Sequence, residues 1–149
     1  MFPSEIHDLA RKVIETYTDQ KRRIVTAESC TGGLVAAALT QISGASAVIE
    51  RGFISYSNDA KTELLGVMPD ILERYGAVSE QAAEVMAQGA LDFSRADIAI
   101  SVTGIAGPTG GTCKRSSAKV RNASIPKRLP GEKASDMEEA SMNVRAVKE

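Results

Sequence analysis

The run IAISV at residues 98–102 is the feature that most constrains the fold of this 149-residue chain. It is short, continuous and apolar, which is typical of a central strand buried on both faces. Such a strand needs a layer of helices on each side of its sheet. It runs into TGIAGPTGG at residues 103–111, whose glycines and proline predict a loop.

Helical and strand patterns alternate before this run. Predicted strands cover residues 24–27 and 48–57, and predicted helices cover residues 4–18, 34–42, 58–65, 69–75 and 80–94. Asn58 or Asp59 is the expected cap of the third helix, because both side chains can accept a hydrogen bond from the first turn. Strands that alternate with helices predict an α/β fold, a layered α/β/α domain with a parallel or mixed sheet.

Composition narrows the class of protein further. A hydrophobic content of 43% is enough for one core, which must be mostly aliphatic because aromatic residues make up only 4%. The net charge of −1 gives no overall attraction to nucleic acid or to an anionic membrane, so neither partner is expected.

No apolar run approaches the roughly 18–20 residues that span a bilayer. The first residues lack an apolar signal segment, so the expected location is the cytoplasm. Cys30 and Cys113 have no metal-ligand spacing and are expected to be free thiols, with no metal site.

The pattern changes after Gly111. Residues 1–111 carry 9 Lys and Arg against 14 Asp and Glu, whereas residues 112–149 carry 9 against 5. The last part shows no alternating strand and no long apolar face. We therefore divide the chain into an α/β domain at residues 1–111 and a divergent basic tail at 112–149. The tail is expected to be disordered at 112–133 and weakly helical after that.

The motif TAESCTGG at residues 26–33 lies where a predicted strand ends and a helix begins. Ligands bind beyond the carboxyl ends of the strands in open α/β sheets. The N–H groups at the helix start could hold a phosphate or an oxyanion. Ser29 is therefore a candidate nucleophile. Alternatively, Ser29 or Thr31 only caps the helix.

Two further motifs follow strands. YSNDAK contains Tyr56, Asn58 and Lys61. Lys61 could act as a general base if burial lowers its pKa, or it could be an ordinary exposed lysine. The glycine loop at 103–111 could bind an anion or could be a tight turn, and it is neither a Walker A loop nor GxGxxG.

Single residues near these motifs leave alternatives open. Glu28 could position Lys61, bind a ribose hydroxyl or be a solvated acid. Cys30 could be an alternative nucleophile or an inert thiol, and Thr103 could bind a ligand or cap a turn. All three motifs fall at the carboxyl ends of predicted strands, which places them at one edge of the sheet.

The motifs together resemble a known family. TAESCTGG, RGFISYSNDAKTELLGV, GAVSEQAAEVMAQGA and SVTGIAGPTGG are similar to the C-terminal domain of the competence/damage-inducible protein CinA. The resemblance runs without a visible gap from about residue 4 to residue 111. It implies an α/β domain like those of stand-alone members, which hydrolyse the carboxamide of nicotinamide mononucleotide. The products are nicotinate mononucleotide and ammonia, within pyridine-nucleotide salvage and NAD metabolism.

The resemblance also implies roles for residues of this sequence. Ser29 matches the proposed nucleophile, Lys61 the proposed base and Tyr56 a supporting hydroxyl, with no metal and no organic cofactor. The residues expected to contact the substrate belong to the three motifs and are Glu28, Cys30, Thr31, Gly32, Gly33, Asn58, Thr103, Gly104 and Gly107.

The sequence departs from the family after the glycine loop. Members continue with a Lys-Pro turn, apolar strands and a closing helix, and no equivalent strand is recognisable here. An open sheet edge is therefore expected, and with it association of copies into a homo-oligomer. The basic residue that would bind the phosphate cannot be placed. A nucleotide-binding module without catalysis and a CinA-like interaction protein remain the alternative functions.

Overall fold

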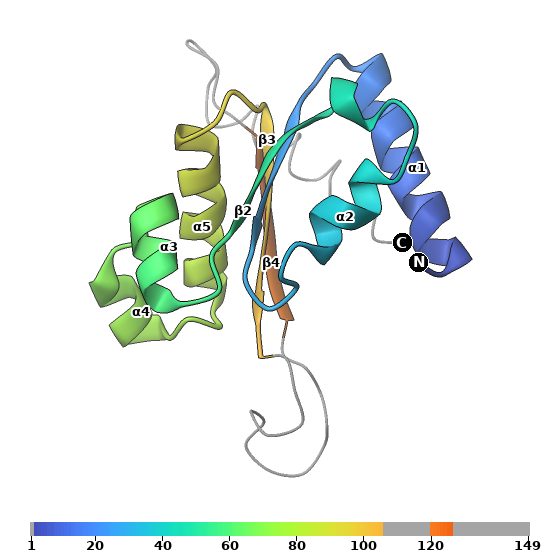
Figure 1. Ribbon diagram of the computed structural model, residues 1–149. Helices are drawn as coiled ribbons and strands as arrows, with labels where there is room; N and C mark the ends of the chain where they lie inside the picture. Colours follow the sequence, from blue (N-terminus) through green and yellow to red (C-terminus); the bar gives the residue numbers. More distant parts are fainter. Residues whose placement is uncertain (1, 106–119, 127–149) are drawn as a thin grey trace.

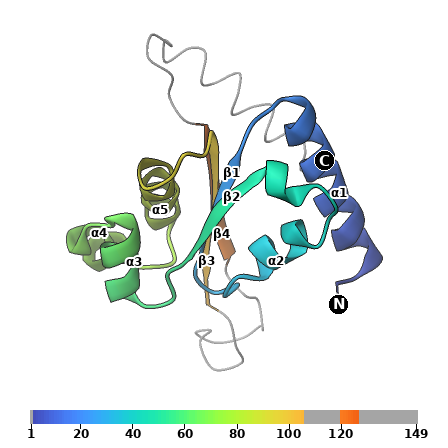
Figure 2. The same ribbon diagram turned by 45° about the horizontal axis from the view of Figure 1, so that its top comes forward.

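A four-stranded sheet lies between two layers of helices in the computed structural model, which describes residues 2–105 and 120–126 (Figure 1). The strands are β1 (Ile24–Glu28), β2 (Ile49–Ile54), β3 (Ile98–Gly104) and β4 (Val120–Pro126). The helices are α1 (Ser4–Asp19), α2 (Leu34–Thr40), α3 (Asn58–Leu65), α4 (Pro69–Tyr75) and α5 (Glu80–Asp92), with a short 3-10 turn, η1 (Ala45–Ala47). Helices α1 and α2 cover one face and α3 to α5 the other, as Figure 2 also shows. The predicted layered α/β fold is confirmed.

The sheet is mixed, in the order β2-β1-β3-β4. Strand β1 pairs in parallel with both β2 and β3, whereas β4 pairs antiparallel with β3, from Ile98 opposite Pro126 to Gly104 opposite Val120. The expectation of disorder across residues 112–133 is therefore wrong for β4. The backbone of β4 pairs with the edge of β3 that was expected to be open. Such pairing is made by backbone groups and needs no apolar alternation in the sequence, so the sequence pattern did not predict this strand. The rest of residues 112–149 lies outside the described residues.

Two apolar clusters hold the layers together, one on each face of the sheet. Alternation along β1 sends Val25 and Ala27 toward α5 and Ile24 toward α1 and α2. The first cluster joins the sheet to α3, α4 and α5, and the second joins it to α1, α2 and η1. Strand β3 is buried along almost its whole length, as the run IAISV predicts.

Small residues bring α5 close to β3. The α5 residues that are fully buried are mostly alanines, and β3 presents Ser101, whose hydroxyl donates to the Ala83 carbonyl at 2.6 Å. Gly89 lies against the end of α3, where a Cβ atom would come within 1.9 Å of the Leu65 carbonyl oxygen. Because α3 carries Lys61, this contact fixes the helix that supplies one candidate site residue.

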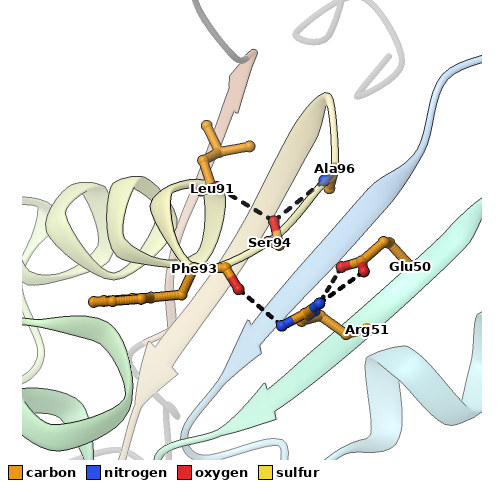
Figure 3. Close-up of polar contacts among 6 residues, drawn as sticks. All are labelled: Glu50, Arg51, Leu91, Phe93, Ser94 and Ala96. Carbon is orange, nitrogen blue, oxygen red and sulfur yellow. Dashed lines mark hydrogen bonds and ion pairs between the residues drawn. The ribbon is translucent and has the colours of Figure 1, made fainter.

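A bulge interrupts the pairing of β1 and β2 at the end of the sheet away from the candidate site. Ile24 lies opposite Ile49 but Val25 lies opposite Arg51, so Glu50 is an extra residue. The bulge lets the neighbouring side chains of Glu50 and Arg51 form two hydrogen bonds, at 2.6 and 2.9 Å, and these lower the pKa of Glu50 (Figure 3). Arg51 also donates to the Phe93 carbonyl at 2.8 Å. The bulge thus ties the edge strand to the end of α5.

The substitution Gly89→Ala tests the close approach of α5 and α3. Alanine favours a helix by about 1 kcal/mol over glycine, but its methyl group would overlap the Leu65 backbone, which cannot move as a side chain can. We expect a net loss of about 2 kcal/mol or more in the free energy of unfolding, measured by chemical denaturation. The control is Glu84→Ala on the exposed side of α5, with a change within about 0.5 kcal/mol. A Gly89→Ala protein as stable as the wild type would contradict this packing.

Candidate active site

The candidate site lies at the carboxyl ends of β1 and β2. From β1 the chain turns into α2 on one face of the sheet, and from β2 it turns into α3 on the other face (Figure 1). Two neighbouring parallel strands whose connections leave in opposite directions open a crevice between them, which is where open α/β sheets bind ligands. Ser29 follows β1, and residues 55–57 follow β2.

Ser29 sits in a tight turn and not at a helix start. Its N–H donates to the Val102 carbonyl at 2.9 Å, and its carbonyl accepts from the Gly32 N–H at 3.0 Å. Gly32 and Gly33 have φ angles of 57° and 102°, which only glycine adopts readily. Helix α2 begins at Leu34, and its N-cap residue, Gly33, has no side chain that could cap it. The interpretation of Ser29 or Thr31 as a helix cap is therefore wrong.

Glu28 supplies the cap instead. One carboxyl oxygen accepts from the N–H groups of Gly33 and Val35 at 3.1 and 3.0 Å, and the other accepts from Ala36 N–H at 2.8 Å. Glu28 is 1% exposed, so it is not a solvated acid, and no contact joins its carboxyl group to Lys61. These N–H groups are therefore already bonded and do not offer the phosphate site that the motif suggested.

Lys61 reaches Ser29 from the far side of the crevice. It lies on α3, is only 2% exposed, and its Nζ lies 3.2 Å from the Ser29 Oγ. The Nζ also donates to the carbonyls of Ser55 at 3.1 Å and Tyr56 at 3.2 Å, with a longer contact to Ser57 at 3.4 Å. The predicted approach of Ser29 and Lys61 is thus present in the structure.

Burial lowers the pKa of Lys61 below its ordinary value of 10.5, because the charged form loses hydration, and the neighbouring Cys30 partly offsets this. A neutral amine has two N–H donors and one lone pair. Two carbonyls of the β2–α3 connection can accept the two donors, which leaves the lone pair for the Ser29 hydroxyl. The geometry therefore suits proton abstraction from Ser29.

Two N–H groups beside Ser29 are unpaired in the part of the chain that the structure describes. Across residues 2–105 and 120–126, the N–H groups of Cys30 and Thr31 donate to no acceptor. The Thr31 Oγ is also buried without a partner in this part of the chain. Adjacent free N–H groups next to a nucleophile are the usual elements of an oxyanion hole.

Two other predicted site residues, Tyr56 and Asn58, make no side-chain hydrogen bond with Ser29 or Lys61 in the described part of the chain. The side chain of Tyr56 is 67% exposed, and its carbonyl, not its hydroxyl, contacts Lys61. Asn58 is the first residue of α3, and the cap is Ser57, whose Oγ accepts from the Ala60 N–H at 3.0 Å. The expected cap by Asn58 or Asp59 is therefore wrong.

The glycine loop is described only at its start. The Thr103 hydroxyl donates to the Ala77 carbonyl at 2.7 Å, so it ties β3 to the segment before α5. Gly104 ends β3, and Gly107 lies outside the described residues. The expected contacts of these residues with a substrate stay predictions.

Ser55 is a site residue that the sequence analysis missed. It is fully buried, its N–H donates to the Glu28 carbonyl at 2.8 Å, and its own carbonyl accepts from Lys61. The available signal was a serine within the last residues of a predicted strand, directly before the YSNDAK motif. Ser55 contributes through its backbone carbonyl, and a backbone contact cannot be predicted from the residue type alone.

Neither a metal-binding cluster nor a membrane-spanning helix occurs in the described part of the chain. No three His, Cys, Asp or Glu side chains within residues 2–105 gather where they could bind an ion. No helix described there is both long and apolar enough to cross a bilayer.

Comparison with known proteins finds relatives over most of this chain. Nicotinamide-nucleotide amidohydrolase PncC of Escherichia coli is 48% identical over 112 residues, which cover 75% of this chain and 68% of that protein. A CinA-like protein of Mycobacterium marinum is 46% identical over 150 residues, covering 95% of this chain and 34% of that protein. The chain spans only 25% of the length of other curated relatives named for CinA or competence damage.

A solved structure and a family match complete the comparison. The crystal structure of the competence/damage inducible protein CihA from Agrobacterium tumefaciens has a TM-score of 0.76 and 41% identity, covering 100% of this chain and 99% of that one. The sequence matches the CinA C-terminal domain over residues 6–128, which passes the boundary expected at residue 111. The chain therefore belongs to the family of the CinA C-terminal domain.

Proposed function

We propose that this chain hydrolyses the carboxamide of nicotinamide mononucleotide to nicotinate mononucleotide and ammonia. The observation that carries the proposal is the 3.2 Å contact between the Lys61 Nζ and the Ser29 Oγ, two side chains that are both buried. The relatives named nicotinamide-nucleotide amidohydrolase PncC supply the substrate. The reaction would belong to pyridine-nucleotide salvage.

The first half of the reaction forms an ester on Ser29. Neutral Lys61 takes the hydroxyl proton as the Ser29 Oγ attacks the amide carbon. The oxyanion that forms is stabilised by the N–H groups of Cys30 and Thr31. Lys61 then returns its proton to the departing nitrogen, and ammonia leaves.

The second half frees the product. Lys61 takes a proton from water, whose oxygen attacks the ester, and the proton passes back to the Ser29 Oγ as the acid leaves. The carbonyls of Ser55 and Tyr56 hold the Lys61 amine in one orientation throughout. The scheme needs neither a metal nor an organic cofactor.

The substrate would lie over the Ser29 turn. Its carboxamide approaches the turn from residue 30 to Gly33, where the glycines leave the backbone open. The nucleotide part would extend toward Asn58 and toward Thr103 and Gly104, at the neighbouring strand ends. The phosphate must lie elsewhere than at the start of α2, since Glu28 occupies the N–H groups there.

The substitution Ser29→Ala tests the nucleophile. We expect kcat for ammonia release from nicotinamide mononucleotide to fall by at least about 10³-fold, because no ester can form. Calorimetry should show nucleotide binding to the variant as tight as to the wild type, which separates lost chemistry from lost folding. Undiminished turnover would exclude Ser29. Tight binding by a wild type that forms no product would favour a nucleotide-binding module.

The pH dependence of activity tests the base. Only the neutral amine accepts a proton, so we expect kcat/KM to rise with pH and to level off, with a midpoint below 10.5. Lys61→Arg, which stays protonated at every pH used, should lose this rise together with most of the activity. A profile that is unchanged in Lys61→Arg would rule out Lys61 as the base.

The pH dependence of stability tests the same residue without a substrate. The folded protein releases the Lys61 proton at a lower pH than the unfolded chain does, so the unfolded chain binds more protons between the two pKa values. The free energy of unfolding of the wild type, compared with Lys61→Met, should therefore rise with pH across that window and end its rise near 10.5. A constant difference in urea denaturation would show that the folded environment leaves this pKa unchanged.

A further inference from the structure

We propose that Glu28 is a positioning residue for catalysis, whose carboxyl group holds the Ser29 turn in its reactive geometry. The inference rests on the proposed function, and it assigns Glu28 a task other than substrate contact. Glu28 is the last residue of β1 and lies directly before the candidate nucleophile. Alternation along β1 places its side chain on the face of α2.

The side chain closes the nucleophile turn into a fixed loop. Ser29 is anchored at one end by the bond from its N–H to the Val102 carbonyl at 2.9 Å. At the other end, the Glu28 carboxyl oxygens accept from Gly33, Val35 and Ala36. Among the described residues, the turn between these anchors leaves the N–H groups of Cys30 and Thr31 without acceptors, which is the arrangement that an oxyanion requires.

The main chain of the same residue holds the base. The Glu28 carbonyl accepts from the Ser55 N–H at 2.8 Å and from the Ser55 Oγ at 3.4 Å. The Ser55 carbonyl in turn accepts from the Lys61 Nζ at 3.1 Å. Substitution of the side chain leaves this second connection in place, so the two roles can be separated by experiment.

The environment of the carboxyl group supports a fixed internal role. No Lys, Arg or His forms an ion pair with Glu28 among the described residues, and three backbone N–H groups at a helix start take the place of a cation. A buried acid is stable only when it is bonded in this way. A substrate group that replaced one of these donors would have to leave the helix end unpaired.

Glu28→Gln is the first test, because it keeps the size of the side chain and replaces one acceptor oxygen by an NH2 group. At least one N–H of α2 then loses its acceptor, and the Ser29 turn can shift. We expect kcat for ammonia release to fall by about 10- to 100-fold, the effect of moving a reacting group by up to about 1 Å. KM should change by less than about twofold, because the carboxyl group itself is buried and bonded to the backbone and makes no contact with the substrate. Amide hydrogen exchange at Val35 and Ala36 should become faster.

The matched control is Ser101→Ala. It removes a buried side-chain hydrogen bond to the Ala83 carbonyl of α5, a bond that does not involve the Ser29 turn. We expect a loss of stability without a loss of kcat, measured below the melting temperature of both variants. If Glu28→Gln does not fold, Glu28→Asp is tested with the same measurements. Its carboxyl group is one methylene too short to reach all three donors, so kcat should again fall.

The outcomes decide between positioning and other roles. A loss confined to KM would make Glu28 a substrate-binding residue and would overturn the inference. A fall in kcat that Ser101→Ala shares would assign the effect to general destabilisation and would also overturn it. Wild-type kcat together with wild-type amide exchange in either folded Glu28 variant would do the same.

A second readout separates this inference from the proposed function. A fluorophosphonate that labels activated serines reports the reactivity of Ser29 without nicotinamide mononucleotide. If the wild type is labelled but releases no ammonia, the proposed substrate is wrong, and slower labelling of Glu28→Gln still supports the positioning role. If Ser29 of the wild type is not labelled, the proposed nucleophile fails, and unchanged amide exchange in Glu28→Gln overturns the positioning role as well.

Discussion

The burial of the Lys61 amine is the constraint on which the rest of the site depends. An amine removed from water loses hydration, and the fold offers it backbone carbonyls and the Ser29 hydroxyl in place of an acidic partner. That arrangement lasts only if α3 cannot move away. The contact of Gly89 with the end of α3 and the apolar cluster around Leu65 hold the helix against the sheet. The stability of the core therefore keeps the amine in a buried position that is unfavourable for its charged form.

The layered fold and the meeting of the motifs could be predicted from the sequence because both follow from strand direction. Parallel strands end at one edge, so residues that follow different strands approach one another there. This reasoning predicts that Ser29 and Lys61, which are 32 residues apart in the sequence, lie close together. The task of Glu28 could not be predicted, because it depends on how the five-residue connection to α2 turns back on itself. Ser55 was missed since it acts through its backbone.

Strand β4 shows a different reason for failure. Residues 120–126 have no apolar alternation, and the prediction of strands relied on that pattern. The strand forms by hydrogen bonding along the whole of β3, where the backbone of a buried strand would otherwise lack partners. After this pairing the outer strands of the sheet are β2 and β4, and the expected homo-oligomer stays a prediction.

The short distance in sequence between Ser29 and Lys61 has a consequence for how the site forms. The two residues belong to one continuous unit, β1-α2-β2-α3, so bringing them together closes a loop of 32 residues and loses less chain entropy than a contact between more distant segments. The Ser29–Lys61 pair thus comes from the first half of the chain, and β3 adds to it mainly the carbonyl of Val102 that anchors the turn.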